Sequence, residues 1–280
     1  MSKKFVYFFA PAQAEGNKDM KDLLGGKGSN LAEMAGIGLP VPPGFTISTE
    51  VCNIFNKAGG KLPSEVEAEI LANLKKLEEV TGQKFGNPAD PLLVSVRSGA
   101  KFSMPGMMDT VLNLGLNDKT IAGLVAKSRN RRFALDCYRR LIHMFGDVVL
   151  GISKKRFEEL LNKHKRAHKI VQDLEMTEEI LAEVIRAYSA LIRKDTGRDF
   201  PQDVMEQLFL AVEAVFKSWN NPRAVTYRRL NHIPDDLGTA VNIQQMVFGN
   251  IGEKSGTGVG FTRNPATGEK SLYGEYLLNA

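Results

Sequence analysis

The sequence is poor in the residues that build metal clusters and disulfide frameworks. Among 280 residues there are 2 cysteines, 4 histidines and 1 tryptophan. The cysteines, Cys52 and Cys137, stand far apart and have none of the spacings of a metal site or a disulfide framework. We therefore expect a reducing compartment, the cytoplasm, and no metal site.

Long hydrophobic runs are also missing. No segment approaches the roughly 20 apolar residues of a membrane-spanning helix, so we expect no membrane partner. The run Phe5–Phe9 follows Lys3 and Lys4 and imitates a secretory signal peptide. It is too short and too aromatic for one, and Pro11 interrupts it. We interpret residues 5–9 as the first β-strand.

The charge balance points weakly to an anionic partner. The chain is 43% hydrophobic and 25% charged, which is ordinary for a globular protein of one large or two modest domains. Its net charge of +5 is spread along the chain, and a nucleotide would suit it as well as a nucleic acid. The basic runs at 154–156 and 228–229 lack an aromatic platform, so we expect no nucleic-acid partner.

Two histidines have a spacing that a metal site could use. His164 and His168 stand four residues apart in a predicted helix. Several basic residues surround them, among them Lys163, Lys165 and Arg166, and would repel a cation. We interpret the pair as part of a solvated basic helix face.

The stretch from Leu92 to Leu116 is the most informative part of the chain. Residues 92–96 form a short apolar run that predicts a buried strand, and Arg97, Ser98 and Gly99 follow it into a loop. Arginine offers a planar fork of donors, and glycine lets backbone N–H groups approach an oxyanion. A second strand is predicted at 110–114. The open alternative is a β-hairpin whose loop is merely tied down by Arg97.

A second candidate anion site is the glycine-rich segment Gly25-Gly26-Lys27-Gly28. We expect a turn here, followed by a helix whose N-terminal region carries Lys27. Unpaired N–H groups and the positive dipole end of a helix favour phosphate. The segment is not a Walker A loop, because Gly28 replaces the Ser or Thr after the lysine. An ordinary turn before a helix remains the alternative.

The rest of the chain divides by its hydrophobic period. From about 118 to 230 the pattern is almost continuously helical, including a helix predicted at 200–219. Strands are predicted again at 241–248, 259–263 and 272–278. The glycine-rich segment 256–260 lacks the spacing of a dinucleotide-binding loop, and we interpret it as a hairpin turn.

Three stretches resemble one family. Leu23–Met34 (LLGGKGSNLAEM), Leu93–Asp118 (LVSVRSGAKFSMPGMMDTVLNLGLND) and Gly238–Asn279 closely resemble the N-terminal, nucleotide-binding part of pyruvate phosphate dikinase. The middle stretch discriminates between relatives. Phosphoenolpyruvate synthases share a strand that ends in Ser-Val-Arg-Ser, but their loop resembles an Ala-Glu-Asp-Leu-Pro pattern. The loop Ser103–Thr110 is similar to the dikinase branch.

The resemblance implies an α+β fold, namely an ATP-grasp N-terminal lobe with a helical insert and the start of a second β-rich lobe. It implies four segments. These are a first lobe of mixed sheet and helices at 1–117, a helical insert at 118–200, helices returning to the first lobe at 201–239, and an incomplete C-terminal lobe at 240–280. Because the chain stops inside that lobe, we expect a fragment of a much longer protein.

The resemblance also implies ATP contacts at individual positions. Lys27 and Arg97, already indicated on physical grounds, would contact ATP phosphates. The loop from Ser103 to Met108 resembles a phosphate-covering glycine loop, which would shield the transfer from water. The strand 244–247 resembles the hinge between lobes, where backbone groups would meet adenine. The expected ATP-binding residues are Lys27, Arg97, Lys101, Ser103, Gly106, Met107, Asp109, Thr110, Arg132, Gln244, Met246 and Val247.

The activity that the resemblance implies belongs to a longer protein. That enzyme interconverts ATP, phosphate and pyruvate with AMP, pyrophosphate and phosphoenolpyruvate, through a phosphohistidine on another domain. Mg²⁺ would accompany ATP, with protein ligands beyond residue 280. We expect no catalytic residue in this chain, because its histidines lack the Thr-Ser-His-Ala context of the phosphohistidine; they are His143, His164, His168 and His232.

The expected partners are ATP, the remainder of the second lobe, the phosphohistidine domain, and further copies of the parent in a homo-oligomer. Two other functions stay open for the 280-residue chain. One is a non-catalytic nucleotide-binding or assembly fragment. The other is the ATP domain of a related phosphoenolpyruvate synthase.

Overall fold

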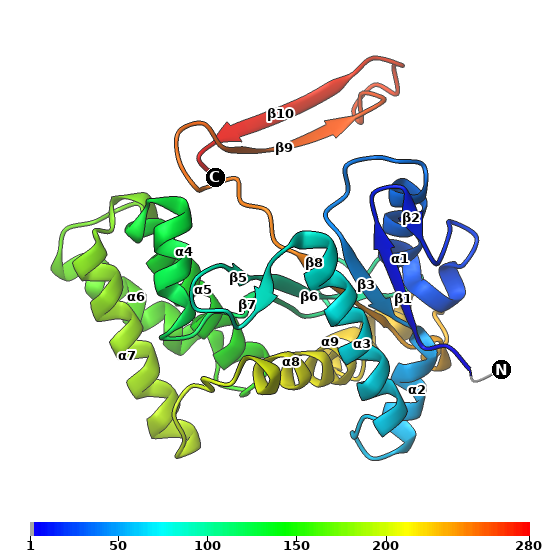
Figure 1. Cartoon of the computed structure of the whole chain (residues 1–280), viewed down its shortest axis with the longest axis horizontal. Helices are drawn as coiled ribbons and strands as arrows, with labels where there is room; N and C mark the ends of the chain where they lie inside the picture. The colour runs from blue at the N-terminus through cyan, green and yellow to red at the C-terminus, as the bar shows by residue number, and fades with distance from the viewer. Residues whose placement is uncertain (1–2) are drawn as a thin grey trace.

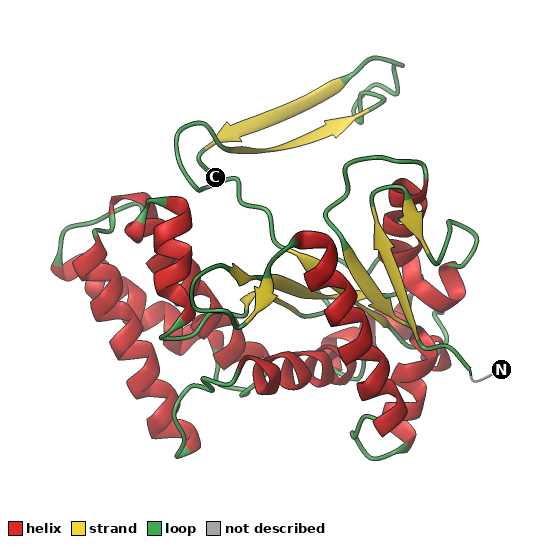
Figure 2. Ribbon diagram, in the orientation of Figure 1, coloured by secondary structure: helices red, strands yellow, loops and turns green. Residues whose placement is uncertain are grey.

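A six-stranded antiparallel sheet forms the centre of the computed structural model, which describes residues 3–280 (Figures 1 and 2). The strand order is β2-β1-β3-β8-β6-β7, and every neighbouring pair runs antiparallel. A short parallel pair, β4 and β5, and a separate hairpin, β9 and β10, complete the strands. The bounds are β1 Val6–Ala10, β2 Gln13–Ala14, β3 Gly44–Ile47, β4 Lys84–Phe85, β5 Pro91–Leu92, β6 Val94–Gly99, β7 Thr110–Leu114, β8 Ala240–Gln245, β9 Gly256–Phe261 and β10 Tyr273–Leu278.

Helices cover both faces of the sheet. Phe9 of β1 packs with Ala35 of α1 on one face. Its neighbour Phe8 points to the opposite face, into the large core that α3 and α8 share with the sheet. The helices are α1 Lys21–Gly36, α2 Thr49–Lys57, α3 Ser64–Thr81, α4 Thr120–Ser128, α5 Arg131–Val148, α6 Lys154–Ala167, α7 Glu178–Thr196, α8 Val204–Ser218 and α9 Pro222–Leu230, with 3₁₀ turns η1 Asp173–Glu175 and η2 Asp235–Leu237.

The strand register separates an apolar row from a polar row. Phe45, Ile243 and Val96 pair across β3, β8 and β6, and all three side chains are fully buried. One residue further along each strand, side chains point to the other face. There the register aligns Thr46 with Asn242, Asn242 with Arg97, and Arg97 with Thr110. The sheet therefore presents a polar row to the side on which α1 lies.

The helical part expected at 118–200 is present as α4 to α7, which gather at one end of the sheet (Figure 1). Helix α5 packs against β7, α4 and α7. The helix predicted at 200–219 begins later, at Val204, because the Asp203 side chain caps it by accepting from the backbone N–H groups of Met205 and Glu206.

The C-terminal hairpin corrects one prediction. Segment 256–260 is not a turn, since it is most of strand β9, and Gly268 with φ 74° lies in the connection to β10. A Cβ on Gly258 would lie 3.0 Å from the carbonyl oxygen of Glu275, so glycine permits close strand approach there. Residues 240–245, with which the expected C-terminal lobe begins, form β8, an inner strand of the main sheet.

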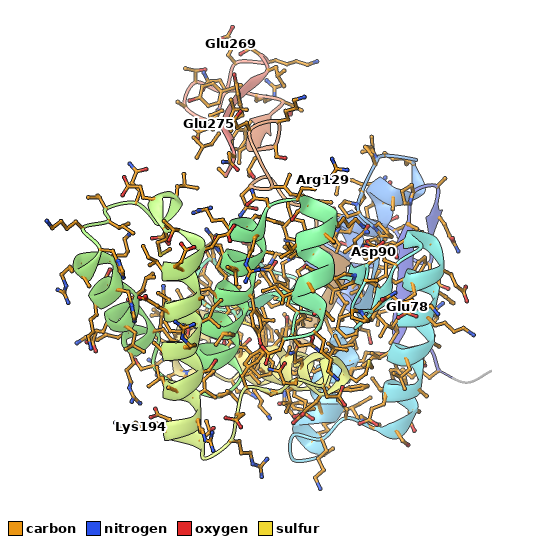
Figure 3. All side chains as sticks on the ribbon, turned by 60° about the vertical axis from the view of Figure 1, so that its left-hand side comes forward. Glu78, Asp90, Arg129, Lys194, Glu269 and Glu275 are labelled. Carbon is orange, nitrogen blue, oxygen red and sulfur yellow. The ribbon has the colours of Figure 1, made fainter. Side chains whose placement is uncertain are left out.

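Beyond β8 the chain leaves the sheet but stays on the body of the protein as far as Ile251, because the Phe248 ring packs edge-on against Phe133 and the Ile251 carbonyl accepts from Asn130 Nδ2 at 3.1 Å. Every residue of β9 and β10 is exposed, and the hairpin projects away with Glu269 and Glu275 at a distance from the sheet (Figure 3). The part that projects is therefore the hairpin from Gly256 onward, whereas Phe248 and Ile251 still pack against the core. Within residues 3–280, no helix combines the length and the apolar character that crossing a membrane requires.

Candidate functional site

A cavity of about 750 Å³ lies between α1, the end of β6 and the loop that follows it. This volume is in the range of small-molecule sites. Six of the expected ATP-binding residues line it, together with residues that the sequence did not indicate, such as Asn242 and Asn30. Of the described residues that line it, three are cationic and none carries a carboxylate. The six expected residues are Lys27, Arg97, Lys101, Ser103, Gly106 and Thr110.

Gly25 positions the helix beside the end of β6. Its φ of 66° and ψ of 176° interrupt α1, so that a second helical segment starts directly after it. A Cβ at this position would lie 1.4 Å from the carbonyl oxygen of Gly99, which only glycine avoids. The N–H of Gly26 donates to the carbonyl of Ala100 at 3.0 Å. The expected turn is therefore a single-residue break, and Gly26 and Lys27 begin the segment at the cavity.

Lys27 and Arg97 place two positive charges close together. Lys27 Nζ donates to the carbonyl oxygen of Ser98 at 2.8 Å. Partial removal of the ammonium from water lowers the pKa of Lys27, and the nearby charge of Arg97 lowers it further, although the residue stays exposed to the cavity. Burial also lowers the pKa of Arg97. Each cation would gain from an anion between them.

Arg97 is held by a neutral side chain. Its Nη2 donates to Gln244 Oε1 at 2.5 Å, and Gln244 Nε2 donates to the carbonyl of Pro42 at 3.0 Å. Within the described residues, the buried Arg97 Nε has no hydrogen-bond partner. Gln244 thus fixes the guanidinium without neutralising it, which leaves donor capacity and full charge for a ligand.

Asn242 is a site residue that the sequence analysis missed. It is 1% exposed, and its Oδ1 accepts from Thr46 Oγ1 at 2.9 Å. Its Nδ2 is buried without a hydrogen-bond partner among residues 3–280. A Cβ on Gly99 would lie 2.4 Å from this Nδ2, so the amide sits directly against the glycine at the end of β6. The available signal was an asparagine inside the apolar strand Ala240-Val241-Asn242-Ile243.

Methionine side chains anchor the loop after β6 to the core. Met104 is buried, and Met107 and Met108 pack against the core, so these methionines tuck under the loop instead of facing water. Met108 also lines the cavity. Lys101, at the loop's other end, pairs with Asp22 at the start of α1. The loop is therefore held in place above the two cations.

Asp109 and Met107 lie outside the cavity lining, on the side of α8 and α9. Asp109 forms an ion pair with Arg223, and its Oδ2 accepts from Asn221 Nδ2 at 3.0 Å. Arg223 Nε also donates to the carbonyl of Met107 at 3.1 Å. Burial raises the pKa of Asp109, against the opposing effect of Arg223. Through these contacts with Arg223 of α9, both residues hold the loop after β6 in place.

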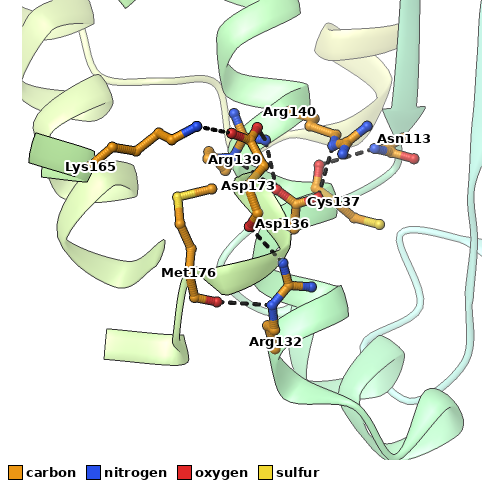
Figure 4. A network of polar contacts seen from close by, with 9 residues as sticks. All are labelled: Asn113, Arg132, Asp136, Cys137, Arg139, Arg140, Lys165, Asp173 and Met176. Atoms are coloured by element: carbon orange, nitrogen blue, oxygen red, sulfur yellow. Dashed lines mark hydrogen bonds and ion pairs between the residues drawn. The ribbon is translucent and has the colours of Figure 1, made fainter. Parts of the chain in front are cut away.

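Arg132 also lies outside the cavity lining, in the helical part. Its Nε donates to the carbonyl of Met176 at 2.9 Å and its Nη2 to the carbonyl of Asp173 at 2.8 Å (Figure 4). Both donations fasten α5 to the segment before α7. The structure gives this guanidinium a structural use, and its contact with phosphate stays a prediction.

The segment 244–247, for which a hinge is predicted, lies at the end of β8. Gln244 is a sheet residue, paired with Gly44 and Ser95. The Met246 N–H donates to the carbonyl of Leu93 at 2.9 Å, and Val247 is 69% exposed. The chain therefore leaves the sheet at Met246 and Val247. Neither residue lines the cavity, so their contact with adenine is untested.

Known proteins resemble the chain over its whole length. Pyruvate, phosphate dikinase of Clostridium symbiosum is 52% identical over 278 residues, which is 99% of this chain and 31% of the relative. The chloroplastic pyruvate, phosphate dikinase of Mesembryanthemum crystallinum is 57% identical over 277 residues, 99% of this chain and 29% of the relative. The chloroplastic pyruvate, phosphate dikinase 1 of Arabidopsis thaliana is 55% identical, over 100% of this chain and 29% of its own length.

The chain thus spans about a third of the length of the curated relatives it matches. The model of one protein family matches residues 21–70 and 56–279, which include Lys27, Arg97 and Asn242. That match covers most of the sequence, and the cavity lies within it. The chain belongs to the family described as pyruvate phosphate dikinase, AMP/ATP-binding domain.

Proposed function

We propose that the chain binds the phosphate groups of ATP in the cavity between α1 and the loop after β6. The observation that carries this proposal is the pair Lys27 and Arg97, two partly dehydrated cations that face a cavity without a carboxylate in its lining. Two buried donors that have no hydrogen-bond partner among the described residues, Arg97 Nε and Asn242 Nδ2, support it. A phosphate group would satisfy both the charges and the donors.

Each residue has a distinct part in this proposal. Lys27, at the start of a helical segment, adds its ammonium to the positive end of the helix dipole. Arg97 supplies the planar donor fork, oriented by Gln244. The loop from Ser103 to Gly106 covers the phosphates and keeps water from them. The backbone at Met246 and Val247 would meet adenine.

The residues of the cavity do not fit a metal ion held by the protein. Mg²⁺ prefers carboxylate and phosphate oxygens, and the described cavity lining has three cations and no acidic residue. We propose that Mg²⁺ arrives with ATP and takes its protein ligands elsewhere in the longer protein.

We propose further that this region is the ATP-grasp part of a dikinase. The whole protein would interconvert ATP, phosphate and pyruvate with AMP, pyrophosphate and phosphoenolpyruvate through a phosphohistidine. Its other domains would be the partners of this chain, within a homo-oligomer. We assign it to the cytoplasm, which the two free, buried cysteines support. The phosphoenolpyruvate synthase alternative loses support, because the family match and the relatives named above are dikinases.

The test is calorimetric titration of the chain with ATP in the presence of Mg²⁺. We expect saturable binding that weakens about tenfold to a hundredfold in Arg97→Ala, which removes charge-assisted hydrogen bonds. Arg193→Ala is the matched control, because that arginine is 72% exposed on α7 and pairs only with an exposed aspartate. Binding that survives unchanged in Arg97→Ala would refute the proposal.

A further inference from the structure

The structure completes a ligand cluster of which the sequence showed only two members. His164 lies in α6, His168 caps its end, and Glu183 comes from the neighbouring helix α7. Glu183 Oε2 lies 3.4 Å from His164 Nδ1 and 3.1 Å from His168 Nε2. The potential ligand atoms of all three residues are within 4.8 Å of one another. We propose that this cluster binds a divalent transition-metal ion, with Zn²⁺ the best match.

The donor set selects the class of metal. Two imidazole nitrogens and one carboxylate oxygen suit Zn²⁺ and its neighbours in the first transition row, whereas Mg²⁺ and Ca²⁺ take oxygen ligands. Three protein ligands leave a fourth tetrahedral position for water. Histidines four residues apart share one face of a helix, so both rings reach the same ion.

The basic neighbours do not all oppose a cation. Lys165 Nζ is held by Asp173 Oδ1 at 2.8 Å, so its charge is already paired (Figure 4). Glu183 also brings a carboxylate to the two imidazoles, so the cluster itself contains an acidic ligand that favours a cation. The prediction of a merely solvated basic face did not include Glu183, because that residue is distant in sequence.

The helices that carry the cluster are fixed relative to each other. Met176 and Leu181 are buried, and Leu161 of α6 and Ile170 pack against them. The connection is braced as well, since Val171 N–H and Gln172 N–H donate to Glu175 Oε2 at 2.9 and 3.1 Å. The three side chains therefore sit on a rigid backbone, which reduces the cost of bringing them to one ion.

A metal ion here would join α6 to α7 and stabilise the helical part. The unfolded chain does not hold the three ligands together, so the ion binds the folded state preferentially and raises its stability by mass action. The cluster is separate from the cavity between α1 and β6, because none of its residues lines that cavity. Metal binding and ATP binding can therefore be tested independently.

The experiment is a titration of the chain, prepared without a polyhistidine tag, with Zn²⁺ followed by calorimetry and with Co²⁺ followed by visible absorption. We expect one equivalent of metal to bind, together with a rise in the unfolding temperature. His168→Ala and Glu183→Gln should each weaken binding by at least about tenfold, since losses of this size accompany even outer-shell changes. Both positions are on the surface, so both variants should fold.

His232→Asn is the matched control, because it removes a histidine outside the cluster and asparagine tolerates the φ of 52° at that position. It should bind Zn²⁺ like the parent chain. Absence of saturable binding would overturn the proposal. Equal binding by the parent, His168→Ala and Glu183→Gln would overturn it too, and so would a loss confined to one of the two variants.

Discussion

Two arginines in different parts of the molecule show how burial and pairing separate structure from function. Arg139 of α5 is 4% exposed and pairs with Asp136 at 2.7 Å, while Arg140 binds the same carboxylate at 2.8 Å (Figure 4). Asp136 raises the pKa of Arg139 despite its burial. Arg97 is half-buried, contacts the neutral Gln244, and has a lowered pKa.

The different partners of Arg139 and Arg97 indicate where an anionic ligand would bind. The helical part pairs its buried Arg139 with a carboxylate of the same helix, so removing that partner would leave an uncompensated buried charge. The cavity beside β6 keeps Lys27 and Arg97 without a carboxylate in its lining, at a cost in desolvation that an anionic ligand would offset. Lys27 and Arg97 are held by a carbonyl and an amide oxygen, whereas Arg139 is held by a carboxylate, and this contrast distinguishes the proposed site from the helical part.

The largest expected effect comes from breaking the buried ion pair between Arg139 and Asp136. Asp136→Asn leaves Arg139 buried with only the more distant Asp173, at 3.5 Å, as an acidic partner. We expect a loss of about 3–5 kcal/mol in the free energy of unfolding, measured by urea denaturation. Asp199→Asn is the control, because it breaks an exposed pair and should cost no more than about 1 kcal/mol. Equal losses of unfolding free energy in the two variants would contradict the expectation that the buried ion pair matters more than the exposed one.

The next effect concerns the glycine that brings Lys27 to β6. Gly25→Ala would place a Cβ against the carbonyl of Gly99 and force α1 away from the cavity. We expect a destabilisation of about 3 kcal/mol and loss of ATP binding, measured by denaturation and calorimetry. Gly38→Ala separates the strain of a positive φ from the steric clash of the added Cβ. Gly38 also has a positive φ, of 84°, but nothing lies near its Cβ position, so it should cost only about 1 kcal/mol.

Removing the unpaired charge should affect ligand binding more than stability. In Lys27→Met we expect ATP affinity to fall about tenfold or more, because a charged hydrogen-bond donor is lost. The folded chain should keep its free energy of unfolding to within about 0.5 kcal/mol, with a small gain, because a partly dehydrated ammonium is replaced by an apolar group. A clear loss of stability would mean that Lys27 is a structural residue like Arg139.

The smallest effect is expected at Asn242. Asn242→Ala removes one neutral donor that lies against Gly99, so ATP binding should weaken by about 1 kcal/mol, or roughly fivefold. Thr46→Val removes only the hydrogen bond to Asn242 Oδ1 and should leave ATP affinity nearly unchanged. Calorimetry on both variants would distinguish a ligand donor from a packing residue, and equal affinities would refute the donor role.

Much of this arrangement could be predicted from the sequence. Local patterns suffice for β1, β6 and β7 and for the helices from α4 to α9. The proximity of Lys27 and Arg97 is not a local pattern, and it was implied only by the resemblance, which assigned both residues to the phosphates of one ligand. Strand alternation explains why Arg97 points away from Val94 and Val96, which are fully buried in the core.

What could not be predicted depends on contacts between distant segments. The central position of β8 follows from pairing with β3 and β6, which lie far earlier in the chain. That pairing brings Asn242 between Thr46 and Arg97 and makes it part of the cavity. The packing of α6 on α7 brings Glu183 to His164 and His168 in the same way. No local pattern contains these pairings.

The most direct test of the account is a calorimetric comparison of inorganic tripolyphosphate with adenosine as ligands of the chain. If Lys27 and Arg97 form a phosphate site, tripolyphosphate should bind, compete with ATP, and lose affinity in Arg97→Ala, whereas adenosine alone should bind weakly. Adenosine binding without any binding of tripolyphosphate would contradict the account, because the charges around the cavity would then serve no anion.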